Sequence, residues 1–209
     1  MPPDAVVSHC KTVKSLPWES LAEGWARVAP ATPSNLEALH DAYVERFDTF
    51  RDPERAARVR VAVKAVGARA AAGARVSFPG LCEVMALALE QESVGFRSEP
   101  AYANAKMETY GCDPRLEPAL TKLIAGIEAK DWHPLLKACR IYLEVRFFHP
   151  FAEGNSAAAR LAFQWVAQRE GLSLPELTSL FRQPIAPGNE AHYRAFLERA
   201  GSLLGQAAR

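Results

Sequence analysis

Helical periodicity is the feature that most constrains the fold of this chain. Over two long stretches, apolar residues recur at steps of three and four along the sequence: Leu116, Leu120, Leu123, Ile124 and Ile127, and then Leu135, Leu136, Cys139, Leu143 and Phe147. This spacing puts the apolar side chains on one face of a helix. Both stretches are therefore expected to be amphipathic helices that pack by these faces.

Further helices are expected elsewhere, most of them with Pro, Gly or Asn near a boundary. They span about residues 18–28, 35–47, 53–72, 81–91, 156–170, 175–181 and 190–204. Between two helices, residues 94–110 alternate aromatic and β-compatible residues with small ones, which favours a short hairpin or extended flap. The expected fold class is thus all-α, a helical bundle with a short β-hairpin flap.

The composition is that of an ordinary globular protein. With 209 residues, 49% apolar and 23% charged, the chain fits one domain over residues 1–209. The 25 basic and 24 acidic residues give a net charge of +1, so no overall field favours nucleic acid or an anionic membrane. The chain start lacks a leader pattern and no segment approaches a membrane-spanning length, so a cytoplasmic location is expected. The richness in Ala and Arg suggests a bacterial genome rich in GC.

The segment 149–160 carries the candidate chemistry. Pro150 has no N–H and disfavours the α conformation in the residue before it, so the preceding helix should stop at His149. An imidazole is the side chain whose unperturbed pKa suits proton transfer near neutrality. His149 is therefore the candidate catalytic residue, as a general base for a hydroxyl nucleophile.

A phosphate site is expected directly after this turn. Gly154 and Asn155 permit a tight turn before a helix that Ser156 opens as a possible N-cap. A helix N-terminus presents unpaired amides and a partial positive charge, which bind phosphate oxygens. Arg160 lies about one turn inside that helix and has bidentate geometry suited to phosphate, while Glu153 offers an oxygen ligand for Mg²⁺.

The segment resembles the signature of the Fic (filamentation induced by cAMP) domain family. That signature runs His-Pro-Phe, any residue, Asp or Glu, Gly-Asn, then Gly-Arg, two residues and Arg. This chain matches it from His149 to Asn155 and again at Arg160. The resemblance covers roughly residues 81–204, which makes about residues 1–75 an N-terminal helical extension of the Fic core.

The resemblance implies an activity and a set of roles. Such domains move AMP from ATP to a protein hydroxyl, and relatives transfer other phosphate-containing groups. His149 would then deprotonate a protein or small-molecule acceptor, Glu153 would hold Mg²⁺, and Gly154 and Asn155 would cradle the transferred phosphate of ATP or another nucleotide donor.

The residues upstream of the motif resemble the start of the family's target-docking flap. They are Gly95, Phe96 and Arg97, and the flap would align an extended target by main-chain pairing. The aromatic residues of the flap are equally compatible with ordinary core or with the surface of a homodimer.

The sequence departs from the signature at two positions. Ser156 and Ala157 stand where the family usually has glycine and an arginine that grips the polyphosphate. Losing one charge-assisted contact costs about 1.5 to 3 kcal/mol. Three hypotheses follow: a Fic-type transferase, a degenerate protein that binds nucleotide or a partner without turnover, or altered phosphate chemistry on a small metabolite. Arg160 also admits a purely structural reading, as a salt bridge within the bundle.

Many relatives carry an inhibitory helix whose glutamate pairs with the arginine that corresponds to Arg160. Two overlapping partial matches to its pattern make Glu19 and Glu23 candidates for autoinhibition. The alternative is a pair of solvated glutamates in the first turns of a helix, where the helix dipole favours them. The other histidines show no metal-ligand spacing and are expected at surfaces or helix ends: His9, His40, His133 and His192.

Overall fold

The computed structural model is a bundle of helices with one small hairpin. It describes residues 16–25, 30–31, 33–103, 108–186 and 188–208. In chain order the helices are α2 (Trp18–Ala22), α3 (Leu36–Tyr43), the π-helix η1 (Val44–Asp48), α4 (Pro53–Ala71), α5 (Phe78–Leu89), α6 (Leu116–Glu128), α7 (Pro134–Phe148), α8 (Asn155–Arg169), α9 (Thr178–Phe181) and α10 (Glu190–Ala207). The strands β1 (Ala101–Ala103) and β2 (Glu108–Tyr110) pair antiparallel between α5 and α6. The expected all-α fold with a short hairpin flap is confirmed.

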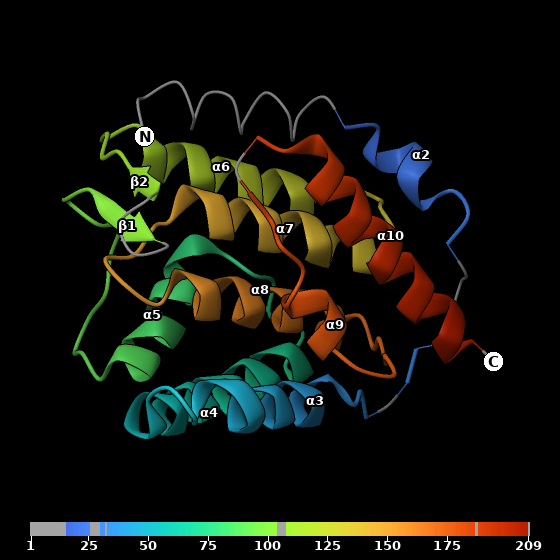
Figure 1. Cartoon of the computed structure of the whole chain (residues 1–209), viewed down its shortest axis with the longest axis horizontal. Coiled ribbons are helices and arrows are strands. Elements are labelled where there is room, and N and C mark those ends of the chain that lie inside the picture. The colour runs from blue at the N-terminus through green and yellow to red at the C-terminus, as the bar shows by residue number, and fades with distance from the viewer. Residues whose placement is uncertain (1–15, 26–29, 32, 104–107, 187, 209) are drawn as a thin grey trace.

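Helix α8 runs through the middle of the molecule. In Figure 1 it lies between α7 and α6 on one side and α4 and α3 on the other, and it packs against α7, α4, α3 and α5. Nearly all of its residues from Asn155 to Ala167 are buried. A helix that is buried all round has small or apolar residues on every face, and the run Ala157-Ala158-Ala159 lets neighbouring backbones approach closely. The first turn of α8 is therefore held in place by the whole bundle.

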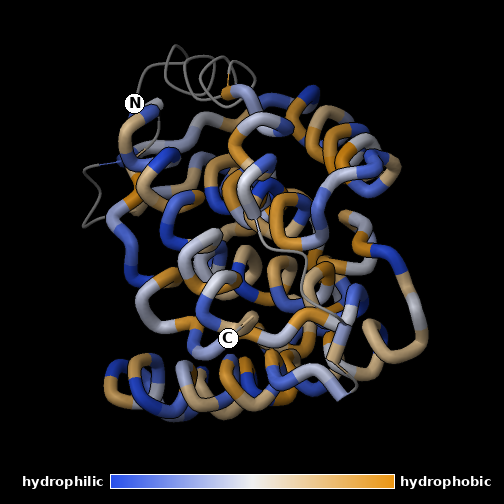
Figure 2. The backbone as a smooth tube through the Cα atoms, turned by 90° about the vertical axis from the view of Figure 1, so that its right-hand side faces the viewer, coloured by the Kyte–Doolittle hydropathy of each residue, from blue (hydrophilic) through white to orange (hydrophobic). Residues whose placement is uncertain are grey.

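The outer helices are amphipathic. Along the lower helical layer, Figure 2 shows hydrophobic and hydrophilic residues alternating, as expected for helices with one face on the core. Apart from Ala101 and Tyr110 of the hairpin, the buried apolar residues of the described chain form one cluster that runs from Leu16 to Leu204 in α10. In the described part of the chain, no helix has the length and apolar character needed to cross a bilayer. The division into an extension and a Fic core stays a prediction.

Several helices begin or end at other residues than the periodicity predicted, and local capping explains the start of α5. Helix α5 begins three residues before the predicted start, because the hydroxyl of Ser77 accepts the Gly80 N–H at 3.2 Å. The predicted helix over 18–28 is observed only as α2, which ends at Ala22, and residues 26–29 lie outside the described part. The predicted helix over 175–181 is reduced to α9.

Candidate functional site

The motif turn begins where sequence reasoning placed it, at the end of α7. That helix ends at Phe148, and His149 adopts a left-handed backbone conformation with φ of 44°. Pro150 prevents the helix from continuing. The rings of Phe148 and Phe151 are buried on either side of the turn. The predicted helix stop at His149 is confirmed, and the two phenylalanines fix its position against the core.

The imidazole of His149 is held by the flap. It stacks on the ring of Tyr110 in β2, with centroids 3.6 Å apart and planes 13° apart. Its Nδ1 is buried and makes no hydrogen bond within the described residues. Burial lowers the pKa of His149 to about 4. The Arg146 backbone raises this pKa, whereas the positive charges of Arg146 and Arg97 lower it further. The imidazole is therefore neutral near pH 7 and able to accept a proton.

Arg97 clasps the flap to the motif turn. Its guanidinium donates hydrogen bonds to the carbonyls of His149 at 2.5 Å, Glu99 at 2.8 Å and Gly111 at 2.7 Å. Its backbone N–H donates to the carbonyl of Pro150 at 2.8 Å. With 6% of its surface exposed, Arg97 is committed to these carbonyls, so its side chain is not available to a docking target.

Of the other two predicted flap residues, one is packed and one is exposed. Phe96 packs on the ring of Phe78, with centroids 5.8 Å apart, whereas Gly95 is exposed. The exposed aromatic residue of the hairpin is Tyr102 in β1, with 56% of its surface accessible. The exposed surface of the flap thus includes Gly95 and Tyr102, whereas Arg97 is buried and Phe96 is partly buried.

The loop between α7 and α8 is closed by Asn155. Its amide oxygen accepts the Phe151 N–H at 2.9 Å, and its amide nitrogen donates to the Phe151 carbonyl at 2.8 Å. Gly154 has φ of 79°, and a Cβ there would lie 2.8 Å from the Met85 side chain. Only glycine fits this position. Gly154 is also the N-cap of α8, so the prediction that Ser156 opens the helix as its N-cap was wrong: Ser156 lies inside the first turn.

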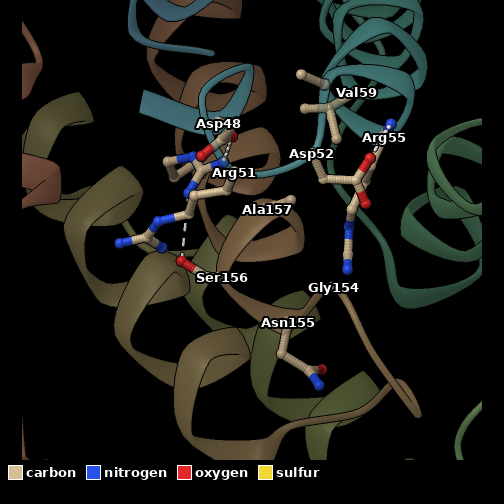
Figure 3. Close-up of a pocket in the computed structure, with 11 residues that line it drawn as sticks. Asp48, Arg51, Asp52, Arg55, Val59, Gly154, Asn155, Ser156 and Ala157 are labelled. Atoms are coloured by element: carbon tan, nitrogen blue, oxygen red, sulfur yellow. Dashed lines mark hydrogen bonds and ion pairs between the residues drawn. The ribbon is translucent and has the colours of Figure 1, made fainter. Parts of the chain in front are cut away.

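A cavity of about 270 Å³ opens in front of this helix start (Figure 3). Two segments line it: Asp48, Arg51, Asp52, Arg55, Ala56 and Val59 from the η1–α4 junction, and Gly154, Asn155, Ser156, Ala157 and Arg160 from α8. The N–H of Ala158 bonds to the Gly154 carbonyl at 2.9 Å, so the amides before it have no carbonyl one turn earlier to bond to. The structure therefore brings all four predicted phosphate-binding residues to one cavity.

Arg160 is buried at the wall of this cavity and is already paired. It forms an ion pair with Asp48, and its Nη1 donates to the Ser156 hydroxyl at 3.2 Å. Its guanidinium also lies over the Tyr43 ring, 4.8 Å from the centroid. Its Nε is buried with no hydrogen-bond partner among the described residues. Arg160, the arginine predicted to bind phosphate, is thus already paired with the carboxylate of Asp48.

His149 and Glu153 do not line this cavity. Glu153 is exposed, and one of its carboxylate oxygens lies 3.2 Å from the Arg55 Nη1. Among the described residues no group of three or more His, Cys, Asp or Glu side chains is arranged to hold a metal. These residues fit Mg²⁺ only as the escort of a polyphosphate, held by one carboxylate and by phosphate oxygens.

The structure does not bring the two candidate inhibitory glutamates to Arg160. Glu19 accepts a hydrogen bond from the indole of Trp132 at 2.9 Å, and Glu19 and Glu23 line a separate cavity beside α7. In Figure 1, α2 lies beside α10, at the opposite edge of the molecule from α4. The carboxylate that pairs with Arg160 comes from η1 instead, a segment that the inhibitory pattern does not include.

Sequence reasoning missed the η1–α4 wall of the cavity. The pair Asp52-Pro53 is a sequence pattern typical of a helix start. In the structure Asp52 is the N-cap of α4, and its carboxylate accepts the Arg55 N–H at 3.0 Å. Nothing local indicates that this helix start faces α8. His40, expected at a surface or a helix end, lies in the last turn of α3 but is fully buried: it bonds to Gln164 at 2.7 Å, and burial lowers its pKa to about 3.

The fold and the site together define a class: an all-helical bundle in which a His-Pro-Phe turn leads into a helix start that faces a charged cavity. Residues 75–167 match the profile described as Fic/DOC family. The chain therefore contains a Fic/DOC-family region, and the predicted resemblance is confirmed.

Solved structures agree with this fold. A Fic domain containing signaling protein from Bacteroides thetaiotaomicron VPI-5482 matches with a TM-score of 0.54 and 16% identity, over 98% of this chain and 94% of that one. A Fic family protein from Desulfovibrio desulfuricans G20 matches with a TM-score of 0.51 and 15% identity, over 99% of this chain and 74% of that one. No curated protein sequence matches the chain.

Proposed function

We propose that this protein is a Fic-type transferase that moves AMP or another phosphate-containing group from a nucleotide-like donor to a hydroxyl of a protein or small molecule. The cavity at the start of α8, with its free amides and the buried Arg160, is the observation that carries the proposal. The Fic/DOC-family region supports an activity of the transferase type. A cytoplasmic setting, where nucleotides are abundant, belongs to the proposal.

The roles follow from the contacts of each residue. Phosphate oxygens accept hydrogen bonds from the first amides of α8, and Arg160 exchanges the Asp48 carboxylate for phosphate. Mg²⁺, when bound, neutralises phosphate charge, and Glu153 is the residue that would hold it. His149 accepts the proton of the acceptor hydroxyl on its imidazole, which is uncharged near pH 7.

The flap supplies a surface for the acceptor. The β1–β2 hairpin exposes Tyr102 beside the strand that holds His149 by stacking. An extended target that adds to the hairpin would bring its hydroxyl towards the histidine. The proposal needs no global charge on the protein, because the anion is held locally.

A labelling experiment tests the proposal. The protein is incubated with Mg²⁺ and nucleoside triphosphates labelled at the α- or γ-phosphate, in an extract that supplies protein and small-molecule acceptors. His149→Ala and Glu153→Ala should abolish transfer of label, whereas the exposed Glu92→Ala serves as the matched carboxylate control and should leave it unchanged. Label that persists in His149→Ala would exclude this histidine as the general base.

A second candidate is a protein that binds a phosphate compound without turnover. Two observations favour it: Asp48 already occupies Arg160, and His149 does not line the cavity. In this case calorimetry would detect binding of nucleotide to the wild-type protein, and the labelling experiment would detect neither transfer nor hydrolysis. Nucleotide binding that Arg160→Ala abolishes, with no transfer of label by the wild type, would favour this second function.

A further inference from the structure

The cavity at α8 has a second wall that does not belong to the signature motif. Figure 3 shows the residues of the η1–α4 junction facing the first turn of α8 across the space above Ala157. Two arginines of this junction, Arg51 and Arg55, line the cavity together with Arg160. About a hundred residues of sequence separate the two walls, so the pairing is a product of the fold.

Arg55 lies directly against the anion-binding amides. Its Nη2 is 3.3 Å from the position that a Cβ on Gly154 would take. Its Nη1 is 3.2 Å from a carboxylate oxygen of Glu153, and the pair is partly exposed, at 34% and 58% of the side-chain surfaces. An exposed ion pair is weak, so a more highly charged anion can displace it.

Arg51 is an exposed cation on the rim of the same cavity. Within the described residues its side chain makes no ion pair or hydrogen bond. The two carboxylates of the lining are in use: Asp48 pairs with Arg160, and Asp52 caps α4 through the Arg55 N–H. The lining therefore holds more positive than negative charge, and one of its cations has no partner in the described part of the chain.

Ala157 is the position on α8 where the family signature has its phosphate-gripping arginine. The alanine lines the cavity and is 7% exposed, so its short side chain leaves the space between the two walls free. The buried Arg160 Nε, which has no partner among the described residues, adds an unsatisfied donor at the same place. The positive charge that the family signature has on α8 is absent at Ala157, but the opposite wall of the cavity carries two arginines.

We propose that Arg51 and Arg55 bind the phosphate chain of the donor and replace the cation that is missing at Ala157. The ligand class is a di- or triphosphate, because several cations around a small cavity match several phosphate charges. The volume of about 270 Å³ lies near the lower end of the range for ligand sites, about 300 Å³, and suits a phosphate chain better than a whole nucleotide. The inference rests on the proposed function only for the position of the phosphate at α8.

Calorimetry of the full chain with sodium tripolyphosphate tests the inference without any turnover. Arg55→Ala and Arg51→Ala should each weaken binding about tenfold, and the double variant about a hundredfold. Arg58→Ala is the matched control, since it lies on the same helix, pairs with Glu90 and has 32% of its side chain exposed, but does not line the cavity. Its affinity should stay within about twofold of the wild type.

A rescue experiment identifies the role of the two arginines. Ala157→Arg added to the double variant should restore most of the lost affinity, because it returns a cation to the same phosphate chain. Unchanged melting temperatures of Arg51→Ala would exclude a folding defect, as this side chain is exposed and unpaired in the described structure.

The outcomes separate this inference from the proposed function. Loss of tripolyphosphate binding in the double variant, with rescue, supports the arginines even if no label is ever transferred. Equal binding by the double variant and Arg58→Ala, or no binding by the wild type, would overturn the inference. Transfer of label that survives in the double variant with unchanged KM for the donor would also overturn it, while leaving the transferase proposal intact.

Discussion

The two sides of the motif turn differ in how their charges are satisfied. On the α7 side, His149 is stacked on Tyr110 and the guanidinium of Arg97 donates to three backbone carbonyls. On the α8 side, the lining arginines form one partly exposed ion pair, Arg55 with Glu153, and one largely buried pair, Arg160 with Asp48. The first side is fixed by internal partners, whereas the second carries the arginines that the proposed anion would bind.

Under the proposed function, this difference would let a short motif combine rigidity with ligand binding. A buried carbonyl without a donor costs free energy, and in this turn Arg97 donates to the His149 carbonyl and Asn155 to the Phe151 carbonyl. Amides at a helix start have no internal partner, and a bound anion is one way to satisfy them. We therefore expect a stable turn to hold an adaptable site, so that substitutions can change one without the other.

The largest expected effect is on the fixed side. Arg97→Ala removes one charged donor from three carbonyls and should lower the free energy of unfolding by about 3 to 5 kcal/mol. Urea denaturation measures it. Arg115→Ala is the control, because that side chain is 89% exposed and pairs only with its neighbour Asp113, and it should change stability by less than about 0.5 kcal/mol. Similar effects of the two variants would contradict the clasp.

The next effect is on the adaptable side. Asp48→Asn removes the carboxylate from Arg160, so tripolyphosphate should bind about tenfold more tightly, while stability falls by about 1 to 3 kcal/mol. Calorimetry and urea denaturation measure the two effects. Asp113→Asn, an exposed carboxylate outside the cavity, is the control for the loss of a negative charge. Unchanged affinity in Asp48→Asn would mean that Asp48 does not compete with the anion.

The sequence predicted the fixed side better than the adaptable side. The proline-stopped helix, the buried phenylalanines and the glycine turn depend on neighbouring residues, which local rules describe well. The tight turn at Gly154 was predicted, but its position as the N-cap of α8 was missed, because serine is the commoner N-cap.

The η1–α4 wall could not be predicted because it depends on long-range packing. The helix over 53–72 was expected, and α4 matches it closely. What brings Arg55 to Gly154 is the packing of α4 on α8, and no short sequence pattern encodes which two helices become neighbours. The buried His40 was missed for the same reason, since its partner Gln164 also lies on α8.

Two buried histidines make the stability of the protein depend on pH. Burial lowers the pKa of His149 to about 4 and that of His40, beside α8, to about 3, against an ordinary value of 6.5. Below pH 6.5 the unfolded chain therefore binds protons that the folded protein does not, and stability falls as the pH drops towards these folded values. At pH 5, each histidine should have lowered the free energy of unfolding by about 1 to 2 kcal/mol.

Variants assign this acid sensitivity to each histidine. His149→Phe keeps a ring for stacking on Tyr110 but cannot titrate, so the loss of stability between pH 7 and pH 5 should shrink by its share. Urea midpoints at the two pH values measure the change. A loss as large as in the wild type would mean that His149 is not protected from protonation in the folded protein.

The smallest expected effect concerns the distant glutamate. Glu19→Ala removes an exposed hydrogen bond to Trp132 and should cost less than about 1 kcal/mol of stability. Because Asp48 and not Glu19 pairs with Arg160, affinity for tripolyphosphate and any transfer of label should stay within about twofold of the wild type. The comparison with Asp48→Asn is decisive, since both changes remove one carboxylate. If Glu19→Ala instead raised binding or transfer as much as Asp48→Asn does, α2 would have to reach the cavity in solution, and the inhibitory role suggested by its sequence would be restored.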